Sequence, residues 1–176
     1  RANPSLDQPS VVPDRQSLLV GAQWFNTSKS LSFSEAQDLF QSNETGIKHT
    51  SQPYLHLTNT EQTYWIQQTV NTEDHTTPQH RHLVLDRQYP QFDNVDLYVA
   101  TEWEAPSHFQ QSDHLDTPGS NVQPRMMAFP ITLKANKRYT ITLAIKSRAQ
   151  QSLALELMAP EQFYSSVKNS EFIWGI

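Results

Sequence analysis

Apolar and polar residues alternate with a period of two along much of the chain, the pattern of strands with one buried face. In the clearest segment, 139–146, aromatic and branched apolar side chains occupy the odd positions and smaller or polar ones the even positions. Further strands are predicted at 54–58, 64–70, 82–85, 95–99, 126–129, 131–133 and 153–158, separated by turn residues such as Pro90, Asn94 and Gly119. No βα repeat intervenes, so we predict an all-β fold of antiparallel strands, a β-sandwich of the jelly-roll type.

One or two short helices are predicted beside these strands. Ser32 lies three residues before Glu35, the spacing of a capping box, and apolar positions follow, which predicts a helix near 33–41. Pro160 suits the first turn of a second helix near 160–170, where apolar residues recur at helical spacing.

These elements predict a single domain with two extensions. Residues 1–17 contain three prolines and are expected to form an extended lead-in, 18–158 the sandwich, and 159–176 a helical connector. The polar stretch 105–123 has no periodicity and is predicted to be a loop. Long loops in compact domains often have a function.

The composition argues against several classes of protein. The 176 residues include 13 Lys and Arg against 18 Asp and Glu, a net charge of −5, and no basic run, so a nucleic-acid partner is not expected. The mean hydropathy is −0.63, and no apolar run approaches the ~18 residues of a membrane-spanning helix. The absence of cysteine excludes disulfides, thiol nucleophiles and cysteine-ligated metal centres.

The two ends of the sequence lead to separate expectations. The chain begins at Arg1 without a signal-peptide pattern, so we expect it to be part of a longer protein. Residues 172–176, Phe-Ile-Trp-Gly-Ile, are almost entirely apolar, and Trp174 suits the interfacial start of a first membrane-spanning helix. The alternative is a terminal segment that packs its aromatic rings on the sandwich.

Several short blocks of sequence carry a family resemblance that covers residues 33–176. They are Tyr-Trp-Ile-Gln-Gln-Thr-Val-Asn at 64–71, Leu-Val-Leu-Asp at 83–86, Phe-Asp-Asn-Val-Asp-Leu-Tyr at 92–98, Arg125 with Phe-Pro-Ile-Thr-Leu at 129–133, and the segment 153–163. In order and spacing they resemble the type 2 extracellular sensor domain of bacterial seven-transmembrane receptors with diverse intracellular signalling modules. One departure is Gln67, because the family often has arginine there, and the charge is therefore missing.

The resemblance implies a fold and a function. The fold it implies is a galactose-binding-like jelly roll similar to carbohydrate-binding modules, located in the periplasm as the extracytoplasmic domain of an inner-membrane protein. The function it implies is a non-enzymatic input domain that binds a carbohydrate or a similar small polar ligand. Its partners would be its own transmembrane bundle and a cytoplasmic histidine kinase or diguanylate cyclase, and a homodimer is left open. The alternatives are a secreted carbohydrate-binding module and a glycan-acting enzyme.

Metal binding and catalysis have weak support in the sequence. His80, His82 and Asp86 share one face if this segment is extended, but zinc requires three or four fixed ligands, so a pair of surface histidines is preferred. The cluster Asp-His-Leu-Asp at 113–116 is interpreted as a solvated loop. A glycosidase would need two carboxylates across a cleft, and spacing does not single out a pair among Glu102, Glu104, Asp86 and Asp96. We therefore expect no metal, no cofactor and no catalytic residue.

A binding site for a sugar-like ligand needs aromatic faces and amide or guanidinium donors on a stiff sheet. Trp103 is the first candidate, because it lies between two glutamates at the start of the predicted loop, and Arg125 leads out of that loop. Trp65 is interpreted as a core residue, and the alternative for Arg125 is an edge-strand charge. The predicted ligand-binding residues are Trp103, Arg125, Tyr98, Arg81 and Gln67.

Overall fold

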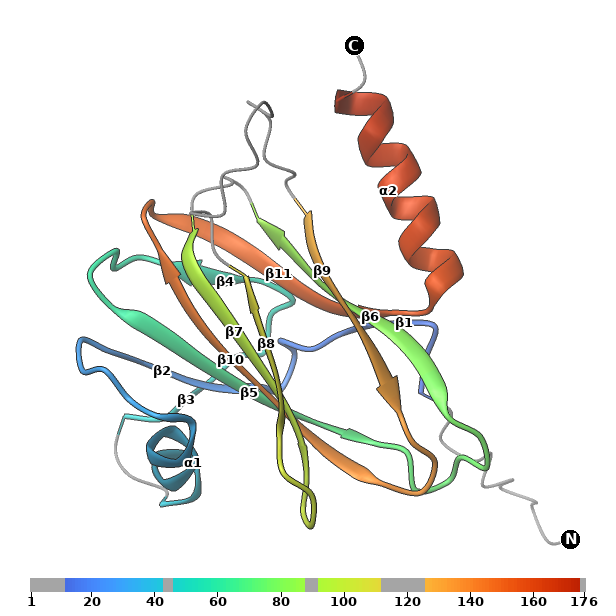
Figure 1. Ribbon diagram of the computed structural model, residues 1–176. Helices are drawn as coiled ribbons and strands as arrows, with labels where there is room; N and C mark the ends of the chain where they lie inside the picture. The colour runs from blue at the N-terminus through green and yellow to red at the C-terminus, as the bar shows by residue number, and fades with distance from the viewer. Residues whose placement is uncertain (1–11, 43–45, 88–91, 112–125, 175–176) are drawn as a thin grey trace, which may run out of the picture.

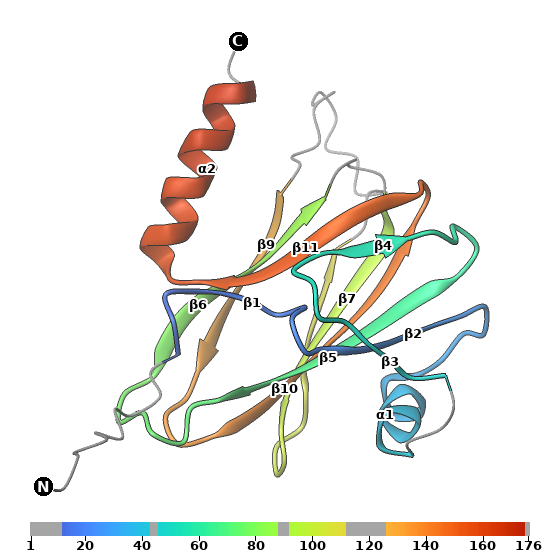
Figure 2. The same cartoon turned by 180° about the vertical axis from the view of Figure 1, so that it is seen from behind.

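Two antiparallel β-sheets face each other and two helices lie outside them in the computed structural model (Figures 1 and 2). The structure describes residues 12–42, 46–87, 92–111 and 126–174. The chain repeatedly crosses from one sheet to the other, as in β9, β10 and β11, so the two sheets are built from interleaved segments. The prediction of an all-β, jelly-roll sandwich with two short helices is confirmed.

The smaller sheet has five strands with β11 and β6 at its centre. Its order is β1-β11-β6-β9, and β4 pairs with the half of β11 that β1 leaves free. The strands are β1 (Arg15–Ser17), β4 (Leu55–Leu57), β6 (Gln79–Arg87), β9 (Met126–Leu133) and β11 (Gln151–Met158).

The larger sheet has six strands with β5 and β10 at its centre. Its order is β3-β2-β5-β10-β7-β8, so the short strands β3 and β8 form the edges. The strands are β2 (Gln23–Thr27), β3 (Lys48–His49), β5 (Thr63–Asn71), β7 (Phe92–Thr101), β8 (Ser107–Gln111) and β10 (Arg138–Ser147).

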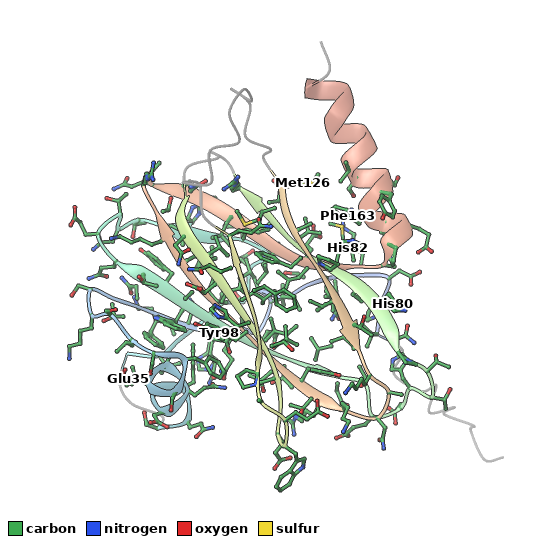
Figure 3. All side chains as sticks on the ribbon, viewed as in Figure 1. Glu35, His80, His82, Tyr98, Met126 and Phe163 are labelled. Atoms are coloured by element: carbon green, nitrogen blue, oxygen red, sulfur yellow. The ribbon has the colours of Figure 1, made fainter. Side chains whose placement is uncertain are left out.

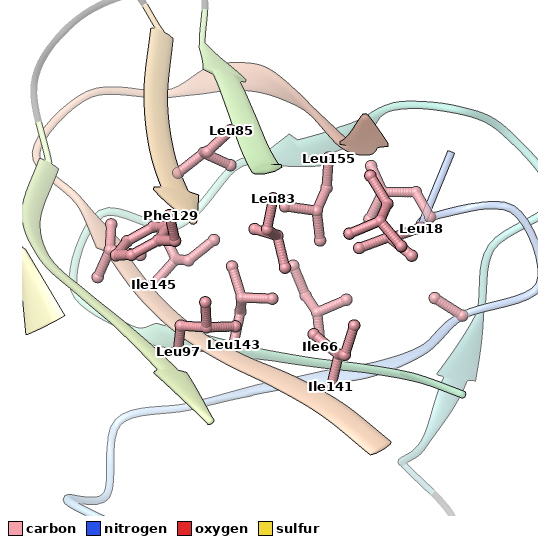
Figure 4. Packing of buried hydrophobic residues seen from close by; sticks show 14 of the residues in the cluster. Leu18, Ile66, Leu83, Leu85, Leu97, Phe129, Ile141, Leu143, Ile145 and Leu155 are labelled. Atoms are coloured by element: carbon pink, nitrogen blue, oxygen red, sulfur yellow. The ribbon is translucent and has the colours of Figure 1, made fainter. Parts of the chain in front are cut away.

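The core lies between the two sheets and is built by every second residue of the central strands (Figure 4). Leu83 and Leu85 of β6 meet Leu143 and Ile145 of β10, and all four are almost completely buried. Tyr64 is also buried, and its hydroxyl accepts hydrogen bonds from the backbone N–H groups of residues 58 and 59, at 3.1 and 3.0 Å. The alternation predicted for 139–146 is therefore the alternation between core and outer face.

Helix α1 (Phe33–Gln41) packs on the outer face of the six-stranded sheet, away from the main core (Figure 1). Its predicted capping box is present: the Ser32 hydroxyl accepts from the Glu35 N–H, and the Glu35 carboxylate accepts from the Ser32 N–H, both at 3.1 Å. Ala36 and Phe40 contact Phe25 and Trp65 of the sheet to form a second, smaller apolar cluster. The interpretation of Trp65 as a core residue is confirmed, since 3% of its surface is exposed.

Helix α2 (Pro160–Trp174) follows β11 directly and begins at the predicted proline. The ring of Phe163 stacks on His82 of β6, with centroids 4.2 Å apart and planes at 11° (Figure 3). The Ser166 hydroxyl lies 3.9 Å from the sulfur of Met158. The first half of α2 is thus docked on the five-stranded sheet, and its C-terminal end points away from the sandwich (Figure 1). Within the described ranges, no helix is long and apolar enough to cross a membrane.

Strands β2 and β3 are absent from the sequence prediction, and β9 is one strand where two are predicted. Two further segments also differ. Residues 15–17, placed in the extended lead-in, form strand β1 on the edge of the five-stranded sheet. Part of the predicted loop 105–123 forms the edge strand β8, and residues 112–125 lie outside the described residues. Both strands pair on one side only, so the apolar alternation that marks a central strand is weak in them. The division of the chain into lead-in, sandwich and connector, with boundaries at residues 17 and 158, remains a prediction.

Replacing each of two tryptophans tests whether its indole ring is buried, because only a buried ring contributes strongly to the free energy of unfolding. We expect Trp65→Ala to lower the free energy of unfolding by about 3–5 kcal/mol, because it leaves a cavity between the sheet and α1. Trp103 is 86% exposed, so Trp103→Ala should change the free energy of unfolding by less than ~0.5 kcal/mol. Urea unfolding of both variants measures the difference, and equal losses would contradict the assigned packing.

The docking of α2 predicts a pH dependence of stability. Burial lowers the pKa of His82 below its ordinary value, so at pH values below about 6.5 the unfolded chain binds the proton more readily than the folded one. Stability is therefore full above that pH and is lost as the pH falls toward the folded pKa. Thermal unfolding at pH 7.5 and 5.5 should show a smaller loss for His82→Gln than for the wild type. His80→Gln, at an exposed histidine on the same strand, is the control and should behave as the wild type.

Candidate functional site

Three rows of side chains cross the outer face of the six-stranded sheet, because the registers of its strands align every second residue. The central row is Phe25, Trp65, Ala144, Asp96 and Gln110. The row beside it is Gln23, Gln67, Thr142, Tyr98 and His108. A third row contains Thr27 and Thr63 from β2 and β5, and Lys146 and Asn94 from β10 and β7. The apolar residues between them face the core.

Helix α1 covers only one part of this face. Most of it lies over the side formed by β2 and β5, and only its first residue, Phe33, reaches Tyr98 of β7 (Figure 1). No other described part of α1 stacks on β7 or β8. Where the segment that joins β2 to α1 meets the sheet, a pocket of about 220 Å³ opens. We call it the Asp96 pocket; its lining residues are Lys29, Ser30, Leu31, Thr63, Trp65, Asn94, Asp96, Tyr98, Ala144 and Lys146.

Aromatic stacking fixes Tyr98 at the wall of this pocket (Figure 3). The ring of His108 stacks on Tyr98 with centroids 4.4 Å apart and planes at 6°, and the ring of Phe33 stacks on it at 4.5 Å and 18°. Trp65 lies farther off, at 6.3 Å. Burial, and secondarily the Asp96 carboxylate, raises the pKa of Tyr98 above its ordinary value. The Tyr98 hydroxyl therefore keeps its proton at neutral pH and can act as a donor.

A chain of hydrogen bonds holds the Asp96 carboxylate in place. The Asn94 amide donates to Oδ2 at 2.6 Å, and His108 Nε2 donates to Oδ1 at 2.7 Å, since an ionised carboxylate can only accept. Gln110 in turn donates to the Asn94 carbonyl oxygen at 3.2 Å. Each carboxylate oxygen has further lone pairs, so Asp96 can accept hydrogen bonds from a bound molecule without rearranging.

Two lysines that line the pocket have no acidic partner among the described residues. Neither Lys29 nor Lys146 forms an ion pair with a carboxylate there, whereas Lys134 and Lys137 both contact Glu104. Nε1 of Trp65 also has no hydrogen-bond partner among the described residues, but this atom is buried and does not open into the pocket.

A second, more open groove lies on the other side of the segment 29–31, between α1 and β2. Its volume is about 620 Å³, and its walls include Phe25, Leu39 and Ile47. Its acidic residues are Glu35 and Asp38 of α1, but the Ser32 N–H and hydroxyl bind the Glu35 carboxylate and lower its pKa. This groove lacks the ordered chain of polar side chains found around Asp96.

Of the five predicted ligand-binding residues, the four that the structure describes are not all brought together. Tyr98 and Gln67 share one row, where the Gln67 amide donates to the Thr142 hydroxyl at 3.1 Å. Arg81 is 6% exposed and lies on the inner side of β6, where it donates to the carbonyl oxygens of residues 80 and 12 at 2.8 and 3.2 Å. Arg125 lies outside the described residues.

Trp103 lies in the turn between β7 and β8, at the end of the sandwich opposite the C-terminal end of α2 (Figure 1). Glu104 holds this turn through Lys134 and Lys137, with nitrogen–oxygen distances of 3.7 and 3.6 Å. The indole is exposed and is remote in register from the Asp96 row.

The histidines considered as metal ligands have other partners. His80 Nδ1 lies 3.2 Å from the Thr132 hydroxyl, and His82 stacks on Phe163. Within the described ranges, no three His, Asp or Glu side chains cluster as metal ligands would. The cluster at 113–116 lies outside those ranges.

Sequence reasoning missed most of the Asp96 pocket. In the sequence prediction Asp96 is only one of several carboxylates, and Lys29, Asn94, His108 and Lys146 are not among the binding residues. One signal was available: positions 94, 96 and 98 alternate with the apolar positions 95, 97 and 99 and place three polar or aromatic side chains on one face.

Comparison with solved structures finds distant likenesses. TmCBM61 in complex with β-1,4-galactotriose aligns with a TM-score of 0.37 and 10% identity, over 53% of this chain and 59% of that chain. An exo-β-1,3-galactanase from Phanerochaete chrysosporium with β-1,3-galactotriose aligns with a TM-score of 0.31 and 14% identity. With galactose, the values are 0.28 and 15%. The last two alignments cover 59% of this chain and 25% of the galactanase. The chain thus spans less than two thirds of each structure, and the scores support no argument about its ligand.

Comparison of sequences gives a clearer result. No curated protein matches. The family model described as 7TMR-DISM extracellular 2 matches residues 22–159, which is more than half of the chain and includes ten of the eleven strands. The resemblance stated from the sequence blocks is confirmed, and the chain belongs to the 7TMR-DISM extracellular 2 family.

Proposed function

We propose that this chain is the periplasmic input domain of a bacterial membrane receptor and that it binds a small polar ligand, of the carbohydrate class, in the Asp96 pocket. Membership of an extracellular receptor-domain family supports the receptor part of this proposal. The observation that carries the site is the fixed carboxylate of Asp96 beside two lysines without acidic partners among the described residues, where the segment 29–31 meets the sheet. Hydroxylated ligands need such a mixture of acceptors and donors in fixed positions.

The same geometry argues against a glycan-acting enzyme. Glycosidases use two carboxylates, about 5 to 9.5 Å apart, on either side of the scissile bond. Among the described residues that line the pocket, Asp96 is the one carboxylate, and two donors already engage it. Such a group suits recognition of hydroxyls better than proton transfer.

Transmission would begin at α2. We propose that ligand binding biases the docked helix, and through it the receptor's transmembrane bundle and a cytoplasmic histidine kinase or diguanylate cyclase. The contacts of Phe163 with His82 and of Ser166 with Met158 support this, because a helix can carry a shift only if it is held against the domain. A secreted carbohydrate-binding module would have no need of a docked C-terminal helix.

Substitution at Asp96 tests the site. Asp96→Asn keeps the shape of the side chain and removes its charge, so we expect sugar binding to weaken at least about tenfold. The free energy of unfolding should fall by roughly 1–3 kcal/mol, because Asn94 or His108 loses its carboxylate acceptor. A thermal-shift screen of monosaccharides identifies the probe, since a ligand at 100 times its Kd stabilises by about 2.7 kcal/mol. Trp103→Ala is the control and should keep wild-type affinity. If Trp103→Ala abolishes binding and Asp96→Asn does not, the site lies at the β7–β8 turn.

An insertion within α2 tests transmission in the intact receptor. We expect four Gly and Ser residues between Val167 and Lys168 to preserve ligand affinity and to uncouple the cytoplasmic output, because they break the helix after its docked half. The matched control inserts Glu-Ala-Ala-Lys, which adds about one helical turn and keeps the helix continuous. Output that still follows the ligand with the Gly/Ser insertion would show that the signal takes another route.

A further inference from the structure

The charges around the Asp96 pocket define its ligand more narrowly than the proposed function does. Lys29 comes from the connection between β2 and α1, and Lys146 comes from β10 in the sheet. Both line the pocket, and neither pairs with a carboxylate in the described part of the chain. The described residues that line the pocket therefore include two lysines and one carboxylate, and that carboxylate already binds Asn94 and His108. Lys29 also lines the second groove, where Glu35 and Asp38 lie.

This excess of positive charge stands out because the chain as a whole has a net charge of −5. Lys134 and Lys137 share Glu104, and Lys48 lies 4.6 Å above the ring of Trp24. Lysines gathered at a pocket without protein partners favour a bound anion, and their attraction is strongest where the walls exclude water.

The uncharged groups of the pocket indicate a second property of the ligand, which is that it carries several hydroxyl groups. Ser30 and Thr63 provide hydroxyls, and Tyr98 provides a protonated phenol. Together with the Asp96 carboxylate they match a ligand with several hydroxyl groups, each of which donates and accepts. A simple inorganic anion would leave most of these groups without a partner.

The volume of the pocket limits the size of the ligand. At about 220 Å³ it is smaller than the roughly 300–1,000 Å³ of sites for drug-sized molecules. A single ring with its substituents is the appropriate scale, either as a free molecule or as the end of a longer chain.

We infer that the Asp96 pocket binds an acidic monosaccharide unit, a hydroxylated ring that carries a carboxylate, with Lys29 and Lys146 at the carboxylate and Asp96 at the ring hydroxyls. This inference rests on the proposed function and adds the charge of the ligand to it. Each ammonium group can form a charge-assisted hydrogen bond with the ligand carboxylate, and such bonds are roughly twice as strong as neutral ones.

Paired sugars of equal shape test the inference. The probes are D-galacturonate and D-glucuronate, their neutral counterparts D-galactose and D-glucose, and the acyclic anions succinate and L-glutamate. Calorimetric titration of the whole chain at low salt should show each uronate binding at least about tenfold more tightly than its neutral counterpart. The uronate affinity should fall as salt is raised, because salt screens the lysines.

Variants of the lysines test which residues cause the preference for uronates over neutral sugars. Lys146→Gln and Lys29→Gln should each reduce the uronate affinity several-fold and the affinity for the neutral sugars by less, and the double variant should abolish the preference. Lys48→Gln, outside the pocket, is the matched control and should keep it. The indole N–H resonance of Trp65 should shift on binding of the uronate, which reports occupation of this pocket and not of the surface.

Each of the other outcomes would contradict one part of the inference: the acidic group, the hydroxylated ring or the site itself. Equal affinity for neutral and acidic sugars, unaffected by the lysine variants, would refute the acidic ligand and leave the proposed function standing. Tight binding of succinate or L-glutamate without uronate binding would refute the hydroxylated ring. If no sugar of either kind shifts the Trp65 resonance, the inference fails together with the proposed site.

Discussion

The register of β10 between β5 and β7 is the constraint on which both the core and the candidate site depend. Leu143 pairs with Ile66 on one side and Leu97 on the other, and all three face the opposite sheet. Because side chains alternate across a strand, burying this row forces its neighbours outward, which places Ala144 between Trp65 and Asp96. A slip of one residue in the register would turn the core-facing side chains outward and the outward-facing side chains into the core. The packing of the core therefore aligns the candidate binding residues on the outer face, and no ligand is needed to align them.

The outer face is divided by α1, and this division makes a pocket out of a flat sheet. Phe40 and Ala36 pack on Phe25 and Trp65, so the part of the face under α1 is a buried apolar cluster. Beyond the edge of the helix the same rows continue as polar groups and meet the segment before α1. The capping box at Ser32 fixes where the helix starts, and hence where the covered half ends. Local helix chemistry thus sets the boundary of the site.

The sequence predicted what depends on local pattern and missed what depends on assembly. Alternation located the central strands, the capping box located α1, and Pro160 located the start of α2. Strand β8 was missed because an edge strand pairs on one side and needs little apolar alternation. The pocket was missed because its residues come from β5, β7, β10 and the segment before α1, and only the register brings them together. Arg81 has a suitable residue type for binding, but its place on the inner side of β6 engages its guanidinium in backbone contacts.

The pocket and α2 lie on different sheets, so a signal between them has to pass from one layer to the other. One covalent route is short: Lys146 of the pocket precedes Ser147, where the register of β10 with β7 shifts. The Ser147 hydroxyl donates to the carbonyl oxygen of residue 149 at 2.6 Å and accepts from the Gln151 amide at 2.7 Å. That buried corner begins β11, and β11 ends at α2. An anion bound at Lys146, as proposed, would act next to this shift in register, where a strand can move without breaking its ladder, on the connection that leads directly to the helix.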